Sequence, residues 1–269
     1  MTTIHHMPEA AYHADQAIGS TTAKLALKSM QLYSDRVSGI APSEDRGYFQ
    51  IGRLMHMQRL EPERFAELTT DKGPINEKTG KPYGRDTKAF AEWQSAHPEI
   101  TVVEPWLYLA FERCPEAVSA LFEGGESEVS AFVRAGKLDV LVKCRCDYLR
   151  GTEIIDLKSC TDVDDAERQI RRLGYWFSAA WYRMVMKEVT GKTHSHRFVF
   201  VEKRAPYRWR IVDLAADYAI YGDAMVERVL GDIHTAHQTG DWADKGELEI
   251  MVSMPDYFDD SEDANEGEI

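Results

Sequence analysis

The sequence contains little cysteine. Only Cys114, Cys144, Cys146 and Cys160 occur in 269 residues, and no two of them form a C-x-x-C pair. Four unevenly spaced thiols are too few for a disulfide framework and lack the spacing of a structural zinc site. Cys144 and Cys146 flank Arg145 on an expected strand, so both sulfurs should point to one face, where packing is favoured over metal binding. We therefore expect reduced thiols.

Long apolar runs are also absent. No stretch of about 18 consecutive apolar residues, the length that a membrane-spanning helix needs, occurs in the chain. The first residues, MTTIHHMPEAAYHADQ, lack the basic-then-apolar order of a secretory signal peptide. These absences predict a cytoplasmic protein without a membrane partner. The hydrophobic content of 43% is sufficient for a substantial core, so a folded globular protein is expected.

Basic residues are outnumbered by acidic ones. The chain has 32 Lys and Arg against 45 Asp and Glu, for a net charge of −13. Nucleic-acid binders are usually basic where they contact phosphate, so this balance argues against a polyanionic partner. The objection weakens because residues 255–269 alone carry seven acids and no base. We interpret them as a solvated, disordered tail, with a DNA-mimicking or partner-binding segment as the alternative.

Helical patterns dominate the first half of the chain and strand patterns the second. Apolar residues at helical spacing predict that residues 1–127 are mainly helical, interrupted by a Gly-, Pro- and Lys-rich loop at 70–86. Strand patterns start at residue 128 and are joined by tight turns at Ala135-Gly136 and Arg150-Gly151.

One long helix is then expected from about Asp164 to Gly191, followed by two strands and a last helix. The pattern predicts a single α/β domain over residues 1–254, in which 128–254 carry a small mixed central sheet flanked by helices.

The stretch TEIIDLKSC, residues 152–160, is an apolar strand that contains two charges. Successive strand residues face opposite sides, so Asp156 and Lys158 share one face. If this strand and the preceding one form a symmetric hairpin, Asp147 lies opposite Asp156 and Arg145 lies opposite Lys158. Opposed like charges are destabilising, and a divalent cation between the two carboxylates would resolve the conflict.

A metal at this position would give each charge a catalytic task. The ion would polarise a phosphodiester oxygen and lower the pKa of bound water, while Lys158 stabilises developing charge or orients the nucleophile. The catalytic candidates are therefore Lys158, Asp156 and Asp147. The alternative is an ordinary solvated hairpin face, because a D-x-K triplet often occurs by chance. The upstream Asp147 and the strand-turn-strand context favour the metal site.

These residues resemble a known nuclease signature. Asp147 followed by Asp156-Leu157-Lys158 is similar to the D…(D/E)xK pattern of the PD-(D/E)XK nuclease superfamily. More narrowly, most of the chain resembles the RecE-type exonuclease domain, exonuclease VIII. The matching segments are YHADQAIGSTTAKLAL, GRLMHMQRLEPERF, CRCDYL and IIDLKSC. The resemblance implies a restriction-endonuclease-like core.

The resemblance also implies a third metal ligand and an activity. By the GRLMH match, His56 would bind the metal beside Asp147 and Asp156, although such a histidine alone is more often a packed or surface residue. The ion would be Mg²⁺ or Mn²⁺, and imidazole suits Mn²⁺ better. The family implies 5′→3′ degradation of double-stranded DNA ends, which exposes 3′ strands for phage-type recombination. It further implies a homotetrameric ring, and an annealing protein is the expected partner.

Candidate DNA contacts surround this core. They are Arg145, Ser159, Thr161, Arg168, Arg171, Ser178 and Tyr182. Ser159 and Thr161 either donate to phosphate or are simple strand-end hydroxyls. Related nucleases often carry Gln-x-x-x-Tyr on the helix after the lysine; here Ser178 stands at the Gln position and Tyr182 is in place.

The basic residues of that helix allow two interpretations. Arg168 and Arg171 would contact phosphate, or they would belong to a solvated basic face. Glu128, at the start of the first strand, is favoured as a surface residue over an additional acidic ligand. His194 and His196 have strand-like spacing without acids or thiols nearby in the sequence, so no zinc site is predicted there.

Two functions other than an exonuclease remain open. One is a non-catalytic DNA-binding accessory protein of recombination that keeps the nuclease fold. The other is a structure-specific endonuclease on the same core.

The GKT triplet at 191–193 does not indicate a nucleotide-binding loop, because it ends a helix and lacks the upstream glycine.

Overall fold

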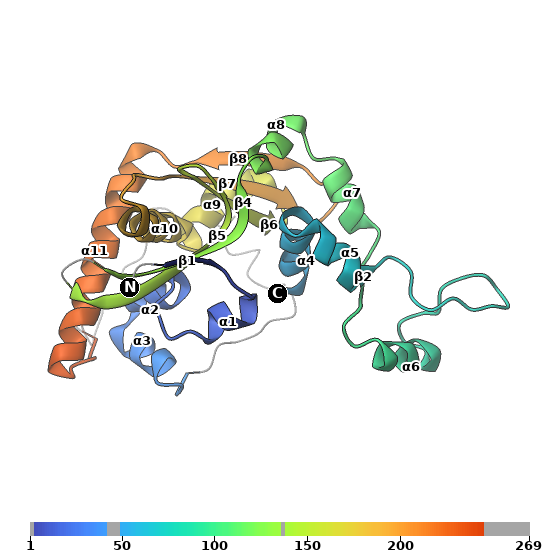
Figure 1. The fold of residues 1–269 in the computed structure, drawn as a ribbon, viewed down its shortest axis with the longest axis horizontal. Helices are drawn as coiled ribbons and strands as arrows, with labels where there is room; N and C mark the ends of the chain where they lie inside the picture. The colour runs from blue at the N-terminus through green and yellow to red at the C-terminus, as the bar shows by residue number, and fades with distance from the viewer. Residues whose placement is uncertain (1–2, 42–48, 136–137, 245–269) are drawn as a thin grey trace, which may run out of the picture.

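Figure 1 shows a computed structural model of the chain, which describes residues 3–41, 49–135 and 138–244. The predicted acidic tail at 255–269 and Gly136 of the first predicted turn lie outside these residues. The structure has an α/β architecture, with a mixed sheet flanked by helices, as the sequence predicts. In the part of the chain that the structure describes, no helix is both long and apolar enough to cross a membrane.

The main sheet has six strands among the described residues, in the order β1-β4-β5-β6-β7-β8. Their bounds are β1 Thr3–His6, β4 Glu126–Ala135, β5 Val140–Arg150, β6 Glu153–Cys160, β7 Ser195–Glu202 and β8 Trp209–Asp213. Neighbouring strands are antiparallel except β6 and β7, which are parallel. A small separate sheet pairs β2 (Thr69–Thr70) with β3 (Thr101–Val102).

Helices cover both faces of the sheet (Figure 1). The helices before β4 are α1 Glu9–Ala14, α2 Ser20–Lys28, α3 Met30–Val37, α4 Phe49–Leu60, α5 Pro62–Leu68, α6 Lys88–Ala96, α7 Trp106–Glu112 and α8 Glu116–Ser119. The helices after β6 are α9 Ala166–Arg172, α10 Tyr175–Thr190 and α11 Ala216–Thr239. Helices α9 and α10 form the crossover that the parallel β6 and β7 require.

β6 is covered by hydrophobic clusters on both of its faces. On one face, Ile154 packs with the fully buried Phe177 and Trp181 of α10. On the other face, Ile155 and Leu157 pack with residues of α4 and α7, including the fully buried Met55. A strand buried on both faces reads as a nearly continuous apolar run, which explains the composition of β6. Asp156 and Lys158 interrupt this apolar run, which indicates a functional role for the two charges.

The structure corrects the predicted long helix from Asp164 to Gly191. A 3-10 turn over Val163–Asp165 leads into α9, and a break at Gly174 separates α9 from α10. Gly174 has a φ of 63°, a left-handed conformation that glycine adopts without steric cost. The sequence prediction treated this glycine as a helical residue and was wrong there.

The structure also contains a strand that the sequence does not predict. β1 pairs with β4, so the first described residues of the chain join the main sheet.

The predicted turn at Arg150-Gly151 is confirmed, because Tyr148 pairs with Ile155 and Leu149 with Ile154 in the expected register. The ladder between β5 and β6 has its last pair at Tyr148 and Ile155.

Candidate metal centre

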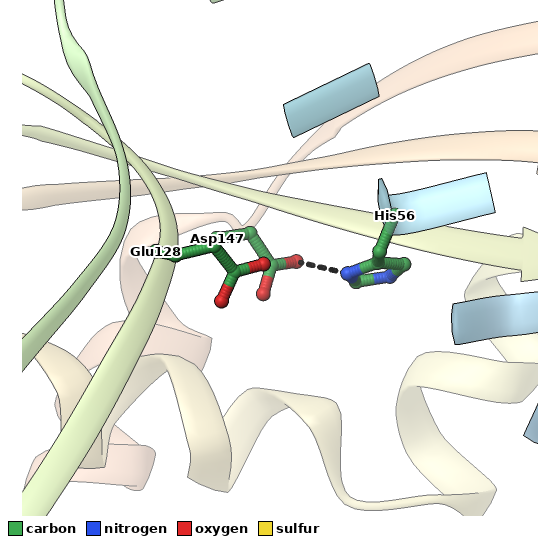
Figure 2. Close-up of side chains that lie close together, drawn as sticks. All are labelled: His56, Glu128 and Asp147. Carbon is green, nitrogen blue, oxygen red and sulfur yellow. Dashed lines mark ion pairs between the residues drawn. The ribbon is translucent and has the colours of Figure 1, made fainter. Parts of the chain in front are cut away.

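Three potential metal ligands lie close together near the open end of the β4–β5 hairpin. One donor atom from each of His56, Glu128 and Asp147 lies within 4.8 Å of the other two (Figure 2). His56 comes from α4, whereas Glu128 and Asp147 come from β4 and β5. His56 Nδ1 is 3.6 Å from Asp147 Oδ2. An imidazole and two carboxylates form a donor set that a divalent ion such as Mn²⁺ can use.

The backbone of the hairpin is distorted where the two carboxylates meet. Ser127 pairs with Tyr148 and Val129 with Cys146, so Glu128 and Asp147 occupy facing positions between two regular pairs. Glu128 has a φ of 57°, which is unusual for a residue with a side chain. Such conformations cost about 1–3 kcal/mol and gather at functional sites, where the surrounding structure enforces them. The unusual backbone conformation of Glu128 is therefore consistent with a functional role for its side chain.

Arg145 holds Glu128 in this position. Its Nε donates to Glu128 Oε2, and its Nη1 donates to the carbonyl oxygen of Met7 at 2.8 Å. Burial raises the pKa of Glu128, although the hydrogen bond from Arg145 opposes that rise. The contact of Arg145 with DNA stays a prediction. In the structure, the guanidinium group of Arg145 faces Glu128, a candidate metal ligand.

Asp147 ends the ladder between β5 and β6. Its Oδ2 accepts a hydrogen bond from the backbone N–H of Leu157 at 2.8 Å, and its side chain is 14% exposed. Burial and the neighbouring negative charge of Asp156 raise the pKa of Asp147 well above the usual carboxyl range. Ionisation of Asp147 is therefore costly beside Asp156, and a bound cation would favour the loss of its proton.

Asp156 and Lys158 form an ion pair on one face of β6, as the alternation predicts. Lys158 Nζ donates to Asp156 Oδ1, and the two side chains are 21% and 5% exposed. Burial alone would raise the pKa of Asp156, but Lys158 and His196 lower it to about 2. Burial opposes the charge on Lys158, and the two aspartates more than offset it, so its pKa is raised. Both groups are charged at neutral pH.

His56 is neutral at the same pH. Burial, and then the charge of Lys158, lower its pKa to about 4. A neutral imidazole has a lone pair available for a metal ion, whereas a protonated one does not. The residues present therefore fit a divalent cation: His56, Glu128 and Asp147 would hold it, with the Asp156 carboxylate next to Asp147.

His196 is a buried neighbour of this centre that the sequence did not indicate. Its Nε2 lies 3.8 Å from Asp156 Oδ2, its side chain is 2% exposed, and neither ring nitrogen has a hydrogen-bond partner among the described residues. Burial lowers its pKa to about 4. The parallel pairing of β6 and β7, which the sequence did not establish, places it beside Asp156.

The remaining predicted DNA contacts lie at different depths. Ser178 is buried and Tyr182 is half-buried on α10, with the Tyr182 ring 6.0 Å from that of His196. Ser159 is half-buried at the end of β6 and Thr161 is exposed.

The two predicted arginines of α9 are exposed and paired locally. Arg168 pairs with Asp165 at 3.5 Å, and Arg171 pairs with Glu167 at 2.7 Å. These contacts fit a solvated helix surface as well as a phosphate-binding one, so the DNA-contact role of both arginines stays a prediction.

The fold and the donor set define a PD-(D/E)XK-like domain with a candidate acidic metal site. The chain belongs to the family described as "PDDEXK-like domain of unknown function (DUF3799)", whose model matches residues 19–253.

Among solved structures, the chain is similar to a "Putative exonuclease" from Eubacterium rectale, with a TM-score of 0.60 and 14% identity. The similarity covers 93% of this chain and 97% of that one, and at this identity it shows the fold alone. A second structure, SSO0001, has 11% identity over 81% of this chain and 88% of its own, and its TM-score of 0.28 carries no argument. Curated proteins gave no match.

Proposed function

We propose that this protein is a Mg²⁺- or Mn²⁺-dependent exodeoxyribonuclease that degrades linear double-stranded DNA from its ends. The RecE-type resemblance supports 5′→3′ polarity and the production of 3′ single strands for recombination. The observation that carries the proposal is the position of Asp156 and Lys158 beside the donor set of His56, Glu128 and Asp147. Carboxylates, an imidazole and an ammonium group together can serve phosphodiester hydrolysis.

In this proposal each residue has a distinct role. His56, Glu128, Asp147 and Asp156 would hold the ion, which would polarise the phosphodiester and lower the pKa of bound water. Lys158 stabilises the negative charge that develops on the phosphoryl oxygens. The water oxygen would form a bond to phosphorus and give up a proton, while the ester P–O bond breaks and the leaving oxygen takes up a proton. Asp156 keeps Lys158 charged and oriented through their ion pair.

The test compares linear duplex DNA with covalently closed circular DNA in the presence of Mg²⁺ or Mn²⁺. We expect the wild type to degrade linear DNA, to spare closed circles, and to lose activity on addition of a chelator. Asp156→Asn and Lys158→Ala should reduce the rate by about 100-fold or more, because each removes charge stabilisation in the transition state. Far-UV circular dichroism checks that both variants fold, and Glu188→Gln on the exposed surface of α10 is the matched control.

The same assay separates the alternatives. Cleavage of closed circles would indicate an endonuclease, and DNA binding without hydrolysis would indicate an accessory protein. Either result contradicts the exonuclease proposal, as does wild-type activity in both the Asp156 and the Lys158 variants.

A further inference from the structure

Lys24 on α2 lies close to the charged residues Asp156 and Lys158 of the candidate metal centre. Its Nζ donates to the carbonyl oxygen of Leu173 at 3.2 Å, and among the described residues no carboxylate forms an ion pair with it. The ammonium group lies 5.8 Å from the centre of the Tyr175 ring, and that of Lys158 lies 5.4 Å from the same ring. Two cations therefore lie near one aromatic residue at the start of α10.

The environment of Lys24 is unfavourable for a cation without a counter-charge. Burial and then the positive charge of Lys158 lower its pKa to about 8, and Asp156 only partly compensates. Lys24 still carries its charge for most of the time at pH 7. An anion that bound between Lys24 and Lys158 would relieve both the repulsion and the poor solvation.

The backbone leaves room for the stem of this lysine. A Cβ atom at Gly174 would lie 3.2 Å from Lys24 Cδ, so the glycine that separates α9 from α10 also accommodates the lysine side chain. The next residue, Tyr175, supplies the ring that the ammonium group contacts. Lys24 is thus held against the α9–α10 junction and does not extend freely into solvent.

We propose that Lys24 binds a phosphodiester group of the DNA strand next to the one that Lys158 faces, with Tyr175 adjacent to both. This inference rests on the proposed nuclease function and adds a substrate contact to it. A strand of duplex DNA carries one phosphate roughly every 3.4 Å along the helix axis, so two ammonium groups beside one ring can serve neighbouring phosphates. A charge-assisted hydrogen bond from an ammonium group to phosphate positions the strand without reading its sequence.

The test measures DNA affinity at several salt concentrations by fluorescence anisotropy, with Ca²⁺ in place of Mg²⁺ to limit hydrolysis. Lys24→Met keeps the apolar stem but removes the charge, and Lys24→Arg restores a charge. We expect Lys24→Met to weaken binding of a linear duplex about tenfold. The plot of log affinity against log salt should become shallower by roughly 0.7–0.9, the value for one lost phosphate contact. Lys24→Arg should keep the wild-type slope.

The control is Lys187→Met, which removes an exposed charge about 18 Å further along α10. It should leave affinity, slope and activity unchanged. A Lys24→Met protein with wild-type affinity would overturn the inference, and so would one with weaker affinity but an unchanged salt slope, since that result indicates a structural role. In both cases degradation of linear DNA by the wild type would leave the proposed function intact. A wild type that neither binds nor degrades DNA would refute the function itself.

Discussion

At the residue scale, the acids of the candidate centre differ in how their charge is compensated. Lys158 compensates Asp156, and Arg145 compensates Glu128. Among the described residues no Lys or Arg pairs with Asp147, which contacts the Leu157 N–H and the neutral His56 and lies beside the Asp156 and Glu128 carboxylates. Asp147 therefore gains the most from a bound cation, and in the metal-free protein its ionised form is costly.

Asp147→Asn should stabilise the metal-free protein. The amide still accepts a hydrogen bond from the Leu157 N–H but removes the buried charge. Because the folded state raises the pKa of Asp147, the wild type loses stability as pH rises above about 4, where the unfolded state ionises first. Thermal unfolding in chelator should show the variant more stable by at least about 1 kcal/mol, roughly 2–4 °C, with a gap that widens as pH rises above about 4. A gap that narrows with pH would contradict the raised pKa of Asp147.

The individual residues of the site differed in how far the sequence could predict them. Strand alternation and hairpin symmetry were enough to propose Asp147, Asp156 and Lys158. His56 came only through the family resemblance, because nothing local places α4 beside the sheet. Glu128 was favoured as a surface residue because its partner was not known. Ala135 pairs with Val140, so the hairpin connection is longer than the predicted two-residue turn, and only this register places Glu128 opposite Asp147.

At the level of secondary structure, two basic residues of β5 form hydrogen bonds with the N-terminal segment, residues 7–15. Lys143 Nζ donates to the carbonyl oxygens of Tyr12 at 2.5 Å and Asp15 at 2.8 Å, while Arg145 donates to that of Met7. Because Arg145 also contacts Glu128, the same strand links the N-terminal segment to the candidate metal centre.

Lys143→Met should destabilise the protein. The buried methionine fills similar space but leaves the carbonyl oxygens of Tyr12 and Asp15 without their donor. The Tyr12 contact is buried and the Asp15 contact is partly buried, and a buried acceptor left unpaired costs about 1–3 kcal/mol, so we expect a loss of about 2 kcal/mol in the free energy of unfolding measured in urea. Lys192→Met, at an exposed position, is the control. Equal stability of the two variants would show that the Lys143 contacts do not hold the segment.

The predicted secondary structure was wrong where tertiary contacts override the local sequence pattern. The pairing of β1 with β4 depends on contacts more than 120 residues apart in the chain, which periodicity does not detect. The break at Gly174 divides a stretch whose apolar spacing remained helical on both sides. The strands β4 to β6 were predicted because short hairpins are encoded locally by alternation and turn residues.

At the scale of the whole molecule, the sheet brings distant segments to one place. His56 from α4, the β4–β6 residues and Lys24 from α2 approach the same region although they are far apart in the sequence. The α/β class followed from the order of the patterns, whereas this convergence depends on the packing of helices on both faces. The tetrameric ring and the annealing partner remain predictions of the resemblance.

Binding of a divalent ion by His56, Glu128 and Asp147 can be measured by electron paramagnetic resonance of Mn²⁺ titrated into the purified protein. We predict that the wild type binds Mn²⁺, that Glu128→Gln weakens binding about 10-fold or more, and that Asp147→Asn abolishes measurable binding at the same concentrations. Glu188→Gln should behave as the wild type. Equal Mn²⁺ affinity in the wild type, Glu128→Gln and Asp147→Asn would contradict the account.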